Sequence, residues 1–185
     1  MKRIATVVVM LHLGVAAVYA QEKPVKMTFS RTSAPSTVNL LQPDTSNDED
    51  NFAGTGTLGS FTVRNVRAIA NSPSSSSTCS GLFVQELAGG GVFRFQDGSL
   101  LSVNLTQGGD CINFAPVPEA HCTVTFQITG GTGRFKNARG TLTFTETVLP
   151  VLADASNNPV FFAATGEYTG TVSGVSEEQG QDEGQ

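Results

Sequence analysis

The sequence predicts an all-β protein built as a single antiparallel β-barrel of about eight strands, with a β-sandwich as the alternative. Apolar and polar residues alternate along many short stretches, and glycine-containing turns stand between them. No stretch beyond residue 20 repeats its apolar residues with the 3.6-residue period of a helix. Charged residues make up only 15% of the chain, whereas helical bundles are rich in Ala, Glu, Lys and Leu. The length of 185 residues favours one domain.

The chain directly after residue 20 is predicted to hold an N-terminal strand and an acidic loop, in residues 21–52. Residues 25–30 alternate weakly, as a strand does. The run 44–50 places four acidic side chains among Thr, Ser and Asn, which is typical of an exposed loop. It lacks the alternating ligands and the fixed glycine of an EF-hand loop, so we expect a solvated segment rather than a calcium site.

The barrel domain is predicted over residues 53–173. The expected strands are residues 54–67, 82–87, 92–96, 100–106, 122–129, 141–148 and 160–172. We expect a turn at the three glycines 89–91, and a hairpin turn at Asp97 and Gly98, because both central positions of a type I′ turn need a positive φ. The clearest alternation lies in residues 141–148, where every odd position is Thr. Consecutive strands with turns between them indicate an antiparallel sheet.

Both ends of the chain are predicted to lie outside the barrel. Residues 1–20 combine two basic residues, an apolar stretch and a small-residue ending at Ala20, which is typical of a cleaved signal peptide. An uncleaved membrane anchor is the alternative, although the apolar stretch is short for a spanning helix. We therefore expect a secreted or periplasmic protein. Residues 174–185 are expected to form a disordered acidic tail, because residues 177–185 hold no large apolar side chain.

Charge and histidine content exclude several functions. Cleavage after Ala20 would remove two basic residues and no acid, which leaves nine basic and 16 acidic residues and a formal charge of −7. Such a chain has no electrostatic support for binding nucleic acid, and we expect no membrane partner after cleavage. His121 would be the only histidine left, which weakens any Ser-His-Asp or Cys-His mechanism. We predict no metal site and no cofactor.

Three cysteines in an exported chain favour one disulfide and one free thiol. We expect Cys111 to pair with Cys122, since that bond would join the two ends of the glycine- and proline-rich connection 107–120. A bond from Cys79 to either partner is the alternative. The cysteine left over is expected to be a buried small side chain, with a reactive thiol as the other interpretation.

Three charged residues break the alternation of their strands. Arg67 shares its parity with Phe61 and Val63, and Glu86 and Glu146 share theirs with apolar neighbours. If these faces point inward, the barrel contains two carboxylates and a guanidinium, which need partners because a lone buried charge is very costly. We therefore predict that Arg67, Glu86 and Glu146 bind a ligand at one end of the barrel; in the alternative they lie at strand ends in contact with water.

Residues 128–140 contain the turn Gly-Gly-Thr-Gly-x-Phe-x-x-Ala-x-Gly. This turn resembles that of the allene oxide cyclase and dirigent-like β-barrels, and of bacterial secreted proteins of unknown function that share it. The resemblance covers about residues 54–172 and implies an eight-stranded barrel, but it brings no catalytic residue to this chain. Physically, the stretch favours a tight turn that places Phe135 in the core over a phosphate loop, because a strand rather than a helix follows it.

These observations favour a non-enzymatic secreted barrel that binds a small apolar ligand or has a structural or interaction role. The alternative is an isomerase or cyclase similar to the allene oxide cyclases and dirigent proteins, which steers a reactive intermediate. A cavity of about 300 Å³ or more inside the barrel would favour binding or cyclisation. Layers of Phe side chains would favour a scaffold. Oligomers are compatible with either function.

Overall fold

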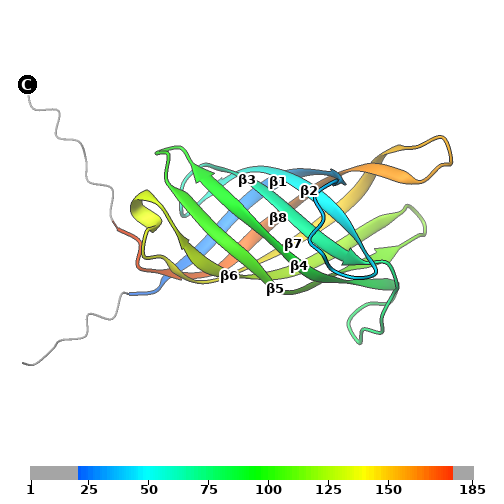
Figure 1. Cartoon of the computed structure of the whole chain (residues 1–185), viewed down its shortest axis with the longest axis horizontal. Helices are drawn as coiled ribbons and strands as arrows, with labels where there is room; N and C mark the ends of the chain where they lie inside the picture. Colours follow the sequence, from blue (N-terminus) through cyan, green and yellow to red (C-terminus); the bar gives the residue numbers. More distant parts are fainter. Residues whose placement is uncertain (1–20, 177–185) are drawn as a thin grey trace, which may run out of the picture.

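The computed structural model describes residues 21–176, which form a closed barrel of eight antiparallel strands (Figure 1). Neighbouring strands follow one another in chain order, and β1 pairs with β8 to close the sheet. The strands are β1 (Lys23–Pro35), β2 (Thr45–Gly56), β3 (Phe61–Ala70), β4 (Leu82–Phe95), β5 (Leu100–Asn113), β6 (Glu119–Gly131), β7 (Arg139–Ala153) and β8 (Pro159–Ser173). The prediction of a barrel of about eight strands is confirmed, and closure leaves no sheet edge exposed along most of its height.

Alternation of side chains explains which residues fill the barrel. In β1, every second residue from Val25 to Ser33 is buried, and the residues between them are exposed. The same period of two runs through β6, β7 and the first part of β3, because successive side chains of a strand point to opposite faces. The described residues contain no helix long and apolar enough to cross a membrane.

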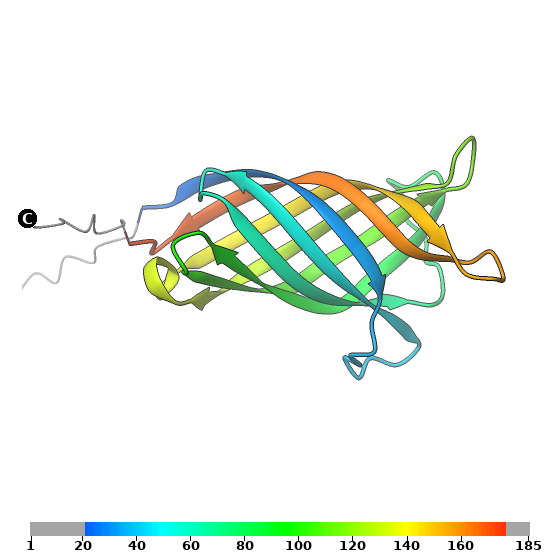
Figure 2. The same ribbon diagram turned by 90° about the horizontal axis from the view of Figure 1, so that it is seen from above.

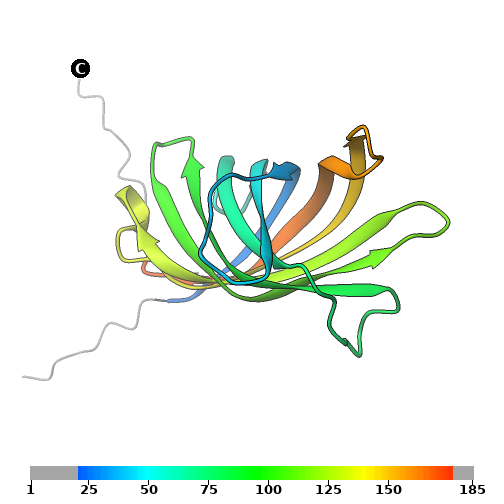
Figure 3. The same cartoon turned by 45° about the vertical axis from the view of Figure 1, so that its right-hand side comes forward.

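The two ends of the barrel differ. At one end, here called the terminal end, lie the start of β1, the end of β8 and the short connections 57–60, 96–99 and 132–138 (Figure 2). At the other, here called the loop end, lie the connections 36–44, 71–81, 114–118 and 154–158, which project away from the barrel in different directions (Figure 3).

An aromatic core fills the terminal half of the barrel. Its rings lie 4.7–6.2 Å apart between centroids, and its members are Phe29, Phe52, Phe61, Phe93, Phe95, Phe126, Phe135, Phe144 and Tyr168. Phe135 comes from the short 3₁₀ helix η1 (Gly133–Phe135) and is fully buried, as predicted. Gly133 makes this possible, because it adopts a φ of 55° and a Cβ there would lie 2.4 Å from the Ser99 hydroxyl.

Three predictions about elements were wrong. Residues 45–50 belong to β2 rather than to an exposed loop, and Asp50 is completely buried. The barrel therefore begins at Lys23 instead of residue 53. The glycines 89–91 lie inside β4 and form no turn, because β4 continues through them in register with β3 and β5. The predicted signal peptide, residues 1–20, lies outside the described residues, as do residues 177–185 of the predicted tail.

Candidate functional site

Beyond the aromatic core, toward the loop end, the barrel interior holds a set of ionisable side chains, here called the charged layer. It consists of Arg31, Asp50, Arg67, Glu86, Asp110 and Glu146, with the amide of Asn65. None of these residues is more than 8% exposed. Two guanidinium groups and four carboxyl groups thus lie in a space from which water is largely excluded, where each needs a partner.

Asp50 is the centre of the charged layer. Its carboxylate accepts hydrogen bonds from Arg31 Nη1 at 2.5 Å, from Arg67 Nε at 2.7 Å and from Asn65 Nδ2 at 3.1 Å. Arg67 also donates through Nη1 to Glu86 Oε1. Arg31 Nη2 lies 2.5 Å from Glu146 Oε1 and forms an ion pair with it, although the contact lacks hydrogen-bond geometry. The network therefore joins β1, β2, β3, β4 and β7 across the interior.

Local backbone geometry brings these side chains inward. Arg67 lies opposite Gly89 on β4, and a Cβ at Gly89 would come within 2.8 Å of the Val66 carbonyl and 3.4 Å of Arg67 Cγ. Glycine at this position therefore lets the backbone of β3 approach β4 closely beside Arg67. The register of β3 and β4 shifts between Ala68 and Ile69, so that Glu86 rather than Leu87 faces the interior.

The structure brings the three predicted residues into one cluster. Arg67 contacts Glu86 directly, and Glu146 is linked to both through Arg31 and Asp50. Arg31 and Asp50 were missed from the sequence. Arg31 has the parity of the buried Met27 and Phe29, and Asp50 that of Phe52, so the signal was present. The Asp50 signal was overlooked because residues 44–50 were interpreted as a loop, and Arg31 lies one residue beyond the alternation expected in residues 25–30. Asp110 was missed too, because residues 107–120 were interpreted as a connection.

Burial and charge act in opposite directions on the carboxyl groups. Burial raises the pKa of Asp50, but Arg67 and Arg31 outweigh that effect and hold the pKa below its usual value. For Glu86 burial prevails over Arg67 and raises the pKa to about 8. Burial likewise raises the pKa of Glu146. At neutral pH the charged layer therefore contains a Glu86 that mostly retains its proton and an Asp50 that is ionised.

Several buried polar atoms of the charged layer have no hydrogen-bond partner among the described residues. They are Arg31 Nε, Asn65 Oδ1, Glu86 Oε2, Asp110 Oδ1 and both carboxylate oxygens of Glu146. All but one are acceptors. A proton on Glu86 Oε2 turns that atom into a donor, and Asn65 Oδ1, Asp110 Oδ1 and Glu146 Oε2 have capacity to accept hydrogen bonds from a further group. No group of His, Cys, Asp or Glu within residues 21–176 has the arrangement of a metal site.

The predicted Cys111–Cys122 disulfide is wrong, because Cys79 pairs with Cys111. In the register of β5 and β6, Cys111 lies opposite His121 and Cys122 lies opposite Asp110. Adjacent residues of a strand face opposite ways, so Cys122 is buried on the inner face while Cys111 points outward. The bond instead attaches the connection 71–81 to the outer wall. Such a bond is typical of proteins in oxidising compartments.

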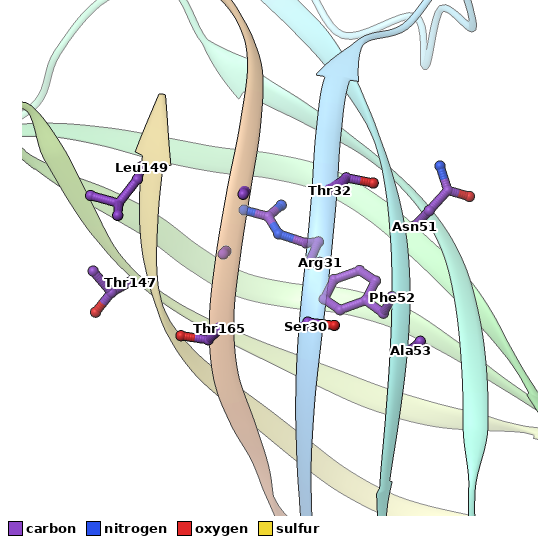
Figure 4. Close-up of a pocket in the computed structure, with 11 residues that line it drawn as sticks. Ser30, Arg31, Thr32, Asn51, Phe52, Ala53, Thr147, Leu149 and Thr165 are labelled. Carbon is purple, nitrogen blue, oxygen red and sulfur yellow. The ribbon is translucent and has the colours of Figure 1, made fainter. Parts of the chain in front are cut away.

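Three pockets lie on the outer wall of the barrel, with volumes of about 580, 460 and 420 Å³. The first, here called the outer groove, crosses β7, β8, β1 and β2 (Figure 4). Two adjacent rows of cross-strand neighbours line it: Thr147, Thr165, Ser30 and Ala53 in one, and Leu149, Ala163, Thr32 and Asn51 in the other. The small side chains in the middle make the hollow.

The outer groove presents no exposed charge. Arg31 and Phe52 contribute to its lining from the wall beneath, but both point into the barrel and are only 3% exposed. The accessible groups are hydroxyls, one amide and methyl groups. They suit an uncharged molecule that has apolar and hydrogen-bonding parts.

Comparison with known proteins gives a likeness of fold alone. No protein-family model matches the chain, and no curated protein does. Among solved structures, the pterocarpan synthase dirigent protein PsPTS1 is similar with a TM-score of 0.46 and 15% identity, over 85% of this chain and 97% of that chain. The pterocarpan synthase dirigent protein GePTS1 is similar with a TM-score of 0.43 and 14% identity, over 85% and 88% of the two chains.

Proposed function

We propose that this protein is an exported, non-enzymatic binding barrel whose interior is a scaffold and whose outer groove takes a small apolar or amphipathic ligand without charge. The observation that carries this proposal is the distribution of space. Aromatic rings and the charged layer occupy the interior, whereas the pocket of about 580 Å³ lies on the outer wall. A scaffold needs a filled core, and a binding site needs accessible concave surface.

The test is to recover the protein from its secretion host, determine its structure at high resolution and identify co-purified molecules by native mass spectrometry. We expect ligand density in the outer groove. Ser30→Arg should abolish co-purification, because Ser30 points outward in the middle of the groove and the longer side chain would fill it. The control is Thr129→Arg, an equally exposed outward position on β6. Density inside the barrel would overturn the proposal, as would equal ligand retention by both variants.

A second candidate is an isomerase or cyclase that acts at Arg67, Glu86 and Glu146. One observation favours it: Glu86 Oε2 is buried without a hydrogen-bond partner among the described residues. Because burial raises the pKa of Glu86 to about 8, this carboxyl group could protonate an intermediate that reached it. This function requires the charged layer to open toward the loop end.

Cys122 can report on that opening, because it lies opposite Asp110 on one side and Glu146 on the other. Under the scaffold function, iodoacetamide should alkylate Cys122 only after unfolding. A cysteine introduced at the exposed position Thr62 in the same protein serves as the positive control. Alkylation of native Cys122 at a rate comparable to that control would favour the internal site and count against the scaffold.

A further inference from the structure

Exposed large apolar side chains gather at the loop end. Eight of them lie in the connections there or in the adjoining strand ends: Val38, Leu41, Leu82, Phe114, Val117, Leu149, Val151 and Leu152. Leu41 is 85% exposed and Phe114 is 67% exposed. Single exposed apolar residues are ordinary, but a group confined to one end of a molecule marks a contact surface.

The loop end also carries very little charge. Residues 36–44, 71–81, 114–118 and 149–162 contain no Lys or Arg and only two acids, Asp44 and Asp154. The adjoining starts of β2 and β6 add three further acids, Asp48, Glu49 and Glu119, and no Lys or Arg. The polar residues of the four ranges are mostly Ser, Thr and Asn. The basic residues outside the charged layer lie along the wall or at the terminal end: Lys23, Lys26, Arg64, Arg94, Arg134, Lys136 and Arg139. This end therefore complements a surface without net charge and offers nothing to attract an anionic one.

The shape of the loop end distinguishes a lipid surface from a protein partner. Its most exposed apolar residues, Leu41, Phe114 and Leu152, lie in or beside the connections 36–44, 114–118 and 154–158. These connections extend in different directions at this end of the barrel (Figures 1 and 3). A protein partner would need three matching hollows at fixed positions, whereas a fluid lipid interface receives separate apolar tips and solvates the Ser, Thr and Asn beside them.

From these observations we propose that the loop end inserts into the interface of a neutral, zwitterionic lipid surface. The apolar tips enter the boundary between headgroups and acyl chains, and the barrel stands on them with its terminal end directed away. The net acidic character of the chain disfavours anionic membranes, and the proposal replaces the wider expectation of no membrane partner with binding to neutral lipid alone. The attraction here comes from apolar burial alone, so it is independent of basic residues.

The experiment is flotation of the protein from its secretion host with phosphatidylcholine vesicles. We expect the wild type to float with the vesicles, and the triple variant L41D/F114D/L152D to bind at least about tenfold more weakly, because each change places a charge at an inserting tip. The control is L87D/V92D, which adds charge at two exposed apolar positions on the outer wall of β4 and should leave binding unchanged. Exchanging part of the lipid for anionic phosphatidylglycerol should weaken wild-type binding.

Three results would overturn the proposal. The first is that the wild type stays with the soluble fraction at millimolar phosphatidylcholine, and the second is that the two variants lose binding equally. The third is self-association in sedimentation velocity that the tip substitutions abolish while vesicles bind nothing, in which case the surface belongs to a second copy of the chain. Circular dichroism of each variant checks that the barrel is retained, which the exposure of all five substituted positions leads us to expect.

Discussion

Arg67 holds the charged layer together, because its guanidinium bridges carboxyl groups from two different strands. It donates to Asp50 on β2 and to Glu86 on β4. Taking charged groups out of water is expensive, and only mutual pairing offsets that cost. A residue of this kind contributes mainly by preventing its partners from remaining buried alone.

We expect Arg67→Met to lower the free energy of unfolding by about 3–5 kcal/mol, the usual cost of removing one partner of a buried pair. Guanidinium chloride unfolding measures it. The matched control is Arg64→Met, three residues earlier on β3, because the Arg64 side chain is 74% exposed and pairs with Glu49 at the surface. That change should cost less than about 1 kcal/mol. Equal losses would contradict a charged layer that depends on Arg67.

Glu86 should make the protein less stable as the pH rises. Its pKa is 4.5 when unperturbed and about 8 in the folded protein, so between these values it is ionised only in the unfolded chain. Stability from this group is fully present below about pH 4.5 and is lost as the pH rises through about 8. Glu86→Gln keeps an acceptor for Arg67 and removes the titration.

The stability of E86Q relative to the wild type should therefore increase between about pH 5 and 8 and then level off, as measured by urea unfolding across this range. Asp50 gives both proteins a pH dependence of stability with the opposite sign, and taking the difference between E86Q and the wild type removes it. Glu167→Gln, at a side chain that is 41% exposed, should give a curve parallel to that of the wild type. A constant difference between E86Q and the wild type would show that Glu86 is ionised in both states.

The alternation of inward and outward positions predicted buried residues well only where the strand itself was predicted. Arg67, Glu86 and Glu146 were selected because they interrupt apolar faces, and all three are buried together. Asp50 also shares its alternation with a buried apolar residue, Phe52. It lies, however, in a run of acidic residues whose composition is typical of an exposed loop. The amino-acid composition of a segment indicates whether such segments are usually exposed or buried. That indication is wrong for a strand that crosses a layer of buried charged residues.

At the scale of elements, the disulfide determines how the longest loop is held. Cys79 lies near the end of the serine-rich connection 71–81, and Cys111 lies on the outer face of β5. Chain closure across a sequence separation of 32 should stabilise the fold by about 3–4 kcal/mol in the chain-entropy description. The bond also keeps this connection against the wall.

Replacing Cys79 by Ser should reduce the stability by that amount and make residues 71–81 the first site of proteolysis, as measured by chemical unfolding and by mass mapping of early fragments. Cys111 should then remain a free thiol rather than pair with Cys122, because the two point to opposite faces of the sheet. Formation of a Cys111–Cys122 bond in the folded variant would contradict the register of β5 and β6.

The sequence could not reveal this pairing because short spacing favoured Cys122 as the partner of Cys111. Deciding between the partners requires knowing which face of β5 and of β6 each cysteine occupies, and hence the register between the strands. Two bulges in that pair, at Ser102 and after Leu105, shift the register. Such shifts leave no clear mark in the alternation of either strand.

At the scale of the whole molecule, the barrel closes through β1 and β8, which bring the beginning and the end of the fold together. Lys23 lies opposite Val172. The β1–β8 pairing is as long as the pairings between strands that follow one another in the chain. We therefore expect folding to depend less on where the chain begins than on closure of the ring. The same closure explains why the fold was predictable: eight alternating segments with short turns have few ways to hide their edges.

A circular permutant that joins Ser173 to Lys23 through a short flexible linker and opens the chain at residues 75–76 should fold to the same barrel. The linker ends are neighbours, and the new ends fall in an exposed serine-rich connection. Circular dichroism and a cooperative urea transition test this. Opening instead between Thr143 and Phe144, in the middle of β7, should prevent folding, because it interrupts pairing with both β6 and β8. Equal folding of both permutants would contradict this account of closure.

The position of both ends of the barrel on one side has a practical consequence. A carrier, dye or solid support attached beyond Lys23 or Ser173 would be linked at the terminal end, which leaves the four connections of the loop end unobstructed. Those connections lie beyond the charged layer, so their sequences can be varied with little contact to the aromatic core. The barrel is therefore suited to immobilisation in a defined orientation and to the display of randomised loops.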